Sequence, residues 1–143
     1  MTLIATSRQK RNALLTGVAL AVFTVLYLAY VWRDPIPPRG GSWPGIIFGV
    51  LAYLMMLFAA FLGVRKKVRT WPLGKATFWM SGHIWLGLLS VAMVFFHTGF
   101  QFGSGLALVV MVLFLVSIAT GIYGLAVQQF LPKTMLKQVA SET

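Results

Sequence analysis

The chain has no cysteine among its 143 residues, and this absence excludes several kinds of site at once. Disulfide bonds, thiolate metal centres and iron–sulfur clusters all need cysteine sulfur. The Cys-x-x-Cys-His sequence that attaches a porphyrin covalently is excluded for the same reason. Any such group would therefore have to be held by non-covalent contacts and by ligands other than thiolate.

Acidic residues are almost as scarce, since the chain has two of them against twelve lysines and arginines. Charged residues make up 10% of the sequence and hydrophobic residues 59%, whereas an ordinary soluble protein is about 25% charged. No Asp, Glu, Lys or Arg falls inside the long apolar runs, which leaves a proton path through them without its usual groups. The composition predicts an integral membrane protein with little chain outside the lipid.

Four apolar runs are each long enough to cross a bilayer. The sequence therefore predicts an all-α protein, an integral membrane four-helix bundle that forms a single transmembrane domain. The first run follows basic residues as a signal sequence does, but it is too long for a signal core, and we expect an uncleaved anchor. Pro132 is expected to stop the last helix. The expected spans cover residues 13–32, 44–64, 76–100 and 106–130.

The net charge of +10 could suggest nucleic-acid binding, but the distribution of the basic residues indicates membrane orientation instead. Ten of the twelve precede the first run, lie in the Arg65–Lys75 loop or follow the fourth run. The other two, Arg33 and Arg39, lie in the loop between the first two runs. The positive-inside rule then places both termini and the Arg65–Lys75 loop in the cytoplasm. We expect no nucleic-acid partner and a weak attraction to anionic lipid.

His83 and His97 are the two histidines of the chain, and they lie fourteen residues apart in the third apolar run. Fourteen helical residues rise about 21 Å, most of a hydrocarbon core about 30 Å thick. They also complete four turns at the repeat of about 3.5 residues of packed helices, so both side chains leave one face. Imidazoles at two depths of one face suit axial ligation of two haems, one near each membrane surface.

Small residues accompany the histidines. Gly87 and Ser90 lie on the stripe that joins them, where a flat macrocycle needs small side chains. Gly49 and Gly63 in the second run are also fourteen apart, and an antiparallel neighbour would place them at the depths of His97 and His83. Glycine lets a porphyrin edge approach the backbone, although small residues also serve ordinary helix packing. On the fourth run, Ala107 and Gly121 repeat the spacing.

This pattern resembles the cytochrome b subunit of quinol-oxidising bc complexes, over roughly residues 45–124. The resemblance consists of the two fourteen-residue spacings, of histidines on one helix and of glycines on the helix before it. It implies b haems at two depths, with His83 and His97 as iron ligands and with Gly49 and Gly63 giving clearance. The family supplies four histidines from two helices of one chain, whereas this chain has one such helix.

Two bis-histidine haems need four imidazoles, so the missing ligands must come from elsewhere. A twofold axis along the membrane normal would bring each histidine opposite its own copy in a second chain. A different histidine-bearing membrane subunit would serve equally, and Met111 on the fourth run is a third candidate ligand. The sequence leaves homodimer and heteromer open.

The function expected from these observations is electron transfer by a di-haem subunit, without bond-making catalysis of its own. The chain would pass electrons between a quinone or cytoplasmic donor and an outer-surface partner. So little chain lies outside the lipid that peripheral redox subunits of a respiratory or photosynthetic complex are expected, in an energy-transducing membrane such as the bacterial inner membrane. The alternatives are a haem-free four-span anchor with structural histidines and, least favoured, a proton path.

Overall fold

The computed structural model describes residues 7–34, 39–67 and 74–141, which do not include the loop residues 68–73. Within these ranges the chain forms four helices and no strand, which confirms the predicted all-α class. Each helix contains a stretch of at least 23 residues that is long and apolar enough to cross a membrane. The helices are α1 (Ser7–Arg33), α2 (Trp43–Lys67), α3 (Ala76–Thr98) and α4 (Leu106–Ser141).

The last two helices do not end where the sequence predicted. Helix α3 ends at Thr98, two residues early, because Gly99 adopts a left-handed conformation (φ 62°) and its N–H binds the Phe95 carbonyl. Helix α4 continues through Pro132 to Ser141, so the predicted stop at Pro132 is wrong. A proline removes one backbone hydrogen bond, and beyond the apolar span water can satisfy the carbonyl that is left without it.

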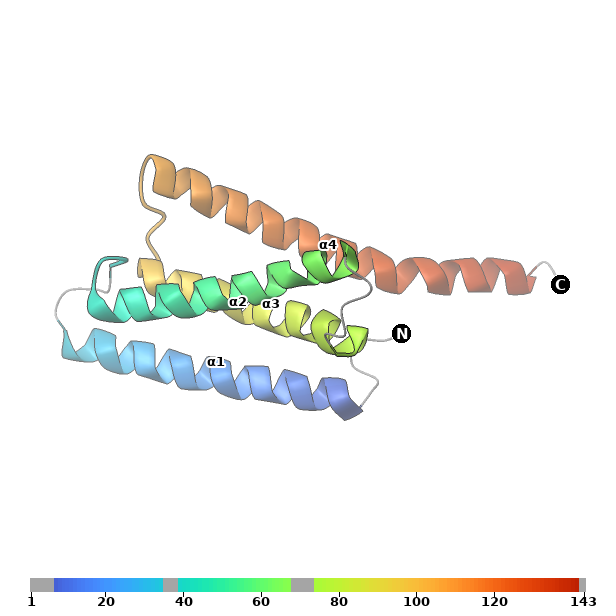
Figure 1. Ribbon diagram of the computed structural model, residues 1–143, viewed down its shortest axis with the longest axis horizontal. Coiled ribbons are helices and arrows are strands. Elements are labelled where there is room, and N and C mark those ends of the chain that lie inside the picture. The colour runs from blue at the N-terminus through green and yellow to red at the C-terminus, as the bar shows by residue number, and fades with distance from the viewer. Residues whose placement is uncertain (1–6, 35–38, 68–73, 142–143) are drawn as a thin grey trace. The chain divides into compact units, whose positions relative to one another are not determined.

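Helices α1, α2 and α3 form one compact unit, Ser7–Gln101, and they lie side by side in Figure 1. Helix α4 belongs to a second unit that begins at Phe102. All candidate residues except those on α4 lie in the three-helix unit.

Contacts between residues far apart in the sequence show which helices run parallel and which run antiparallel. Asn12 and Ser81 meet near the starts of α1 and α3, and the rings of Tyr27 and Phe96 meet near their ends. Both pairs are separated by 69 residues, so α1 and α3 run parallel. Helix α2 runs antiparallel to α3, because its late residues contact the start of α3 and its early residues contact the end. The unit is an up–down–up arrangement of spans.

The core of this unit lies where α2 begins and α3 ends. Tyr27 stacks on Phe96 with ring centroids 4.6 Å apart, and Phe48 meets the edge of Phe96 at 5.4 Å. Met93 is fully enclosed. Outside the core, large apolar side chains are exposed along every span, as expected for helices that contact lipid rather than water. The core cluster consists of Tyr27, Phe48, Ala52, Leu89, Met93 and Phe96.

A second close contact joins α2 and α3 at the opposite end. The rings of Phe58 and Trp79 stack with centroids 4.9 Å apart and planes 7° from parallel. Gly82 lies against Phe58, and a β-carbon at Gly82 would be 2.5 Å from the Phe58 Cε1 atom. The two helices therefore approach closely near both of their ends, and each approach lies beside one of the two histidines.

Candidate functional site

Both histidines of α3 direct their Nδ1 atoms at backbone carbonyls of α2. The His83 Nδ1 atom lies 2.9 Å from the Ala59 carbonyl oxygen, and the His97 Nδ1 atom lies 2.7 Å from the Gly45 carbonyl oxygen. The two accepting residues are fourteen apart, as are the two histidines. The antiparallel pair of helices therefore repeats one interaction at two levels, about 21 Å apart along α3.

The partner of each ring fixes its tautomer. A carbonyl oxygen can only accept a hydrogen bond, so the Nδ1 atom carries the proton and donates it. In a neutral imidazole the lone pair then resides on Nε2. Among the described residues, the structure records no hydrogen bond to either Nε2 atom. Metal-ligating histidines have this arrangement, with the other ring N–H donated to a carbonyl or carboxylate that orients the ring.

His97 is half-buried in the last turn of α3, and two glycines make room for its ring. A β-carbon at Gly49 would lie 2.6 Å from the His97 Nδ1 atom and 2.9 Å from Cε1. A β-carbon at Gly40, in the loop before α2, would lie 3.3 Å from the Cε1 and Nε2 atoms. Any larger residue at position 49 would move the ring away from the Gly45 carbonyl.

His83 is more open than His97. Its side chain is exposed, and nothing lies within 4 Å of a β-carbon placed at Gly63. Gly49 and Gly63 each follow an accepting carbonyl by four residues, so their own N–H groups bind those same carbonyls within the helix. Glycine is sterically required beside His97 and not beside His83. The two levels are therefore equivalent in their histidine–carbonyl hydrogen bonds, but not in the contact between glycine and histidine.

The residues between the histidines differ in accessibility. Gly87 faces open space, with nothing within 4 Å of a β-carbon there. Ser90 is only 1% exposed, and its hydroxyl donates to the Gly87 carbonyl at 2.7 Å. A flat ligand could therefore lie over Gly87 in this packing, whereas it would reach the Ser90 side chain only if the helices moved apart.

Two of the candidates predicted from the sequence, Gly121 and Met111, lie on α4. Gly121 has nothing within 4 Å of a β-carbon placed on it, and Met111 lies in the first two turns of α4. Because α4 forms a unit of its own, a role for either residue beside the histidines stays a prediction.

The donor set limits what the site can bind. No group of three or more His, Cys, Asp or Glu side chains occurs in the part of the chain that the structure describes. A bare zinc ion takes about four protein ligands in a structural site, so a single imidazole at each level does not suit it. Haem brings four nitrogen ligands of its own and needs one or two axial side chains. The exposed His83 imidazole, with no recorded partner at Nε2 among the described residues, fits a haem ligand as it stands. At His97 the Nε2 atom lies beside Gly40, so a haem there would require the loop before α2 to move.

Sequence reasoning found both histidines and Gly49, but it missed the accepting carbonyls, Gly40 and Gly82. Carbonyls occur in every residue and leave no sequence signal. Gly82 directly precedes His83, and its contact with Phe58 depends on the rotation of α3 against α2. Gly40 contacts His97 across 57 positions of sequence, a pairing that no local pattern predicts.

Comparison with known proteins adds no family to these observations. No family model, curated protein or solved structure matches the chain. The four helices long and apolar enough to span a membrane and the two histidine–carbonyl contacts are therefore the observations that bear on function.

Proposed function

We propose that the chain is a di-haem, b-type electron-transfer subunit of a larger membrane redox complex. The observation that carries the proposal is the shared orientation of His83 and His97, whose Nδ1 atoms donate to α2 carbonyls while Nε2 has no partner among the described residues. Haem bound at such a site supplies reversible one-electron transfer.

In this proposal the α2 carbonyls at Gly45 and Ala59 orient the two ligands. A donated Nδ1 hydrogen bond fixes the tautomer and the ring plane. Gly49 keeps the His97 ring against its carbonyl, and Gly87 leaves room on the open side of α3. Electrons would cross the membrane between levels about 21 Å apart along α3, between a quinone or cytoplasmic donor and an outer-surface partner.

The second axial ligands come from outside this chain. A twofold axis parallel to α3 would pair each His83 and each His97 with its copy, so that two chains share two haems. The exposed position of His83 and the open space over Gly87 support such a contact. Peripheral subunits then supply the chemistry at either surface.

A haem-free membrane anchor is the second candidate, and one observation favours it. Each histidine already has a hydrogen-bond partner across the helix interface, which is sufficient to explain a polar side chain in an apolar span. In that case the two imidazoles only join α2 to α3. Each bond would then contribute about 0.6 kcal/mol to stability, the average for hydrogen bonds between membrane helices.

Histidine-to-asparagine substitutions separate these two functions. The Asn Nδ2 atom takes the place of the imidazole Nδ1 and can donate to the same carbonyl, but asparagine has no counterpart of Nε2. Substitutions His83→Asn and His97→Asn should therefore keep the helix contacts and remove the haem ligand. Alanine at the same positions removes both, and Thr98→Val, beside His97, is a control that alters neither.

The measurement is haem per chain, from the pyridine haemochrome and the reduced-minus-oxidised spectrum of the full chain in detergent. We expect b-type bands at about one haem per chain, half of the haem in each single Asn variant and none in the double variant. Two haems per chain would require ligands from a co-purified partner instead of the shared dimer. A colourless, folded wild-type chain, whose stability falls with alanine and recovers with asparagine, would refute haem binding and support the anchor.

A further inference from the structure

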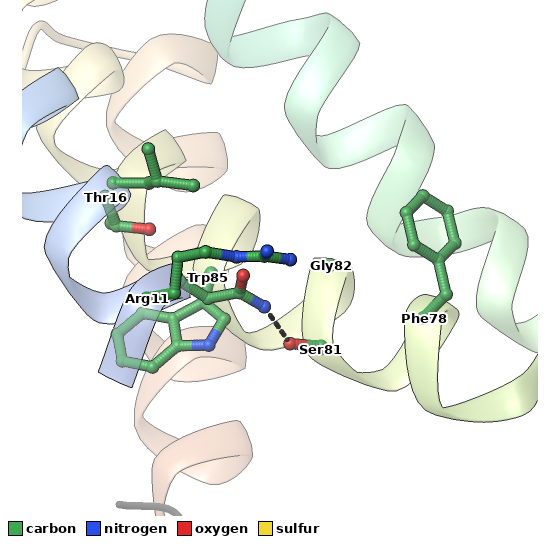
Figure 2. Close-up of a pocket in the computed structure, with 8 residues that line it drawn as sticks. Arg11, Thr16, Phe78, Ser81, Gly82 and Trp85 are labelled. Carbon is green, nitrogen blue, oxygen red and sulfur yellow. Dashed lines mark hydrogen bonds between the residues drawn. The ribbon is translucent and has the colours of Figure 1, made fainter. Parts of the chain in front are cut away.

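A groove runs between α1 and α3, and its two parts have different chemistry. The first part is a hollow of about 250 Å³ at the end where both helices begin. Figure 2 shows the Arg11 side chain extending from α1 toward Ser81 and Gly82 of α3, with Trp85 nearby. Asn12, which also lines this hollow, donates to the Ser81 hydroxyl at 2.8 Å.

The lining of this first hollow favours an anionic group. Arg11 supplies a guanidinium, and Asn12, Thr16, Ser81 and Trp85 add neutral polar groups. None of the described residues that line it is acidic. A phosphate accepts hydrogen bonds from all of these groups, and the fork of an arginine matches its geometry.

The second part of the groove continues directly from the first. Thr16 and Trp85 line both hollows, and beyond them the walls are almost wholly apolar. This part measures about 510 Å³, and Gly17 borders it with nothing within 4 Å of a β-carbon. A polar, cationic pocket thus continues into an apolar trough that suits a hydrocarbon chain. The walls of the trough include Ala13, Gly17, Leu20, Leu88, Leu89 and Ala92.

Contacts join α1 to α3 at both ends of the trough. The Asn12–Ser81 hydrogen bond joins α1 to α3 at one end, and the Tyr27–Phe96 stack joins them at the other. Between these contacts α1 presents small residues, Ala13 and Gly17, to the groove. These small residues leave space for a ligand between the two joined ends.

We propose that this groove binds one anionic phospholipid, with its phosphate at Arg11 and an acyl chain in the trough. Charge complementarity selects this occupant, because the one charged side chain among the described lining residues, Arg11, is positive. The positive-inside rule also places this end at the cytoplasmic leaflet, whose lipids are anionic. The site does not involve the histidines and does not depend on haem.

Native mass spectrometry of the full chain in detergent tests this site. The probes are phosphatidylglycerol and phosphatidylcholine with identical acyl chains. We expect one phosphatidylglycerol to bind at lower concentration than phosphatidylcholine. Arg11→Gln should weaken this binding about fivefold, since one basic residue near anionic lipid contributes about that factor. Lys10→Gln, which removes an exposed neighbouring charge that does not line the hollow, should leave it unchanged.

A second pair of variants tests the trough without altering charge. Gly17→Leu fills the trough and should abolish binding of the lipid, whereas Gly124→Leu, at an open position on α4, should not. Both replace glycine with a better helix former, so loss of fold is not expected.

Several results would overturn the proposal. Equal binding of the two lipids would show that the groove does not select an anionic headgroup. Equal effects of Arg11→Gln and Lys10→Gln would show that the lipid is attracted by surface charge in general and not by the Arg11 hollow. Displacement by inorganic phosphate alone would show that the trough takes no part. Binding of a short-chain benzoquinone that excludes the phospholipid and ignores Arg11→Gln would assign the groove to a neutral ligand.

Discussion

The His97 imidazole lies against the backbone of Gly49, so that a β-carbon at position 49 would come within 2.6 Å of the Nδ1 atom. The absence of a side chain at Gly49 is what allows the ring to reach the Gly45 carbonyl, one turn earlier on α2. The role of this glycine is therefore to admit an imidazole to a backbone carbonyl that also closes a helical hydrogen bond.

Gly49→Ala should release His97 from α2, and Gly63→Ala is the matched control. The added methyl overlaps the His97 ring at position 49 and meets only open space at position 63. We expect Gly49→Ala to lower stability by about 1–3 kcal/mol, as overpacking of a close contact does, and to lower any haem content. An SDS titration followed by circular dichroism measures the first effect. Equal haem loss in both variants would show instead that both glycines border a porphyrin.

Gly82→Ala should loosen the other end of the α2–α3 contact. The new methyl would lie 2.5 Å from the Phe58 Cε1 atom, and the Phe58 ring is already stacked on Trp79. We expect a loss of about 1–3 kcal/mol, measured by the same titration. Gly87→Ala, five residues along α3 and facing open space, is the control and should be close to neutral. Comparable losses in both variants would contradict the close approach at Gly82.

The orientation of the spans can be measured with single cysteines, because the natural chain has none. The positive-inside rule places Lys75 in the cytoplasm and Ser104 outside, and both side chains are exposed. We expect a membrane-impermeant maleimide to label Ser104→Cys in right-side-out vesicles and Lys75→Cys only in inverted ones. The reverse pattern would invert the topology and also move the Arg11 hollow to the other leaflet.

A single cysteine on α3 tests the proposed twofold assembly. In a parallel dimer about α3, Gly87 would face its own copy, because it lies next to His83 on the stripe and borders open space. We expect Gly87→Cys to form a disulfide-linked dimer under mild oxidation in membranes, and Gly17→Cys, on the groove side of α1, not to do so. Cross-linking through Gly17→Cys alone would place the dimer contact elsewhere and leave the second haem ligands to another subunit.

The sequence predicted the helices well because each is defined by a continuous apolar run, and such a signal is local. The α2 and α3 spans were predicted to within a few residues. The predicted end of α4 was wrong, because a proline such as Pro132 ends a helix only where the loss of its backbone hydrogen bond cannot be tolerated. The fourteen-residue spacings likewise predicted one face of α3 correctly, because both histidines contact the same helix.

The sequence could not predict how α2 and α3 pack in detail. Ser90 was expected beside an open macrocycle face, yet it is enclosed in the structure. Gly49 and Gly63 looked equivalent, yet only one of them touches an imidazole. These differences depend on the rotation and separation of two helices, which are set by side chains such as Phe48 and Phe58 meeting α3 from another part of the chain.

The two histidine–carbonyl bonds also have a mechanical consequence. One such bond would leave α3 able to tilt about it, whereas two bonds about 21 Å apart oppose both tilting and sliding of α3 against α2. If α3 slipped by one turn against α2, the His83 and His97 bonds would break together, because their donors and acceptors share one spacing. Helices α2 and α3 should therefore keep a single tilt and register, and move as one body within the membrane.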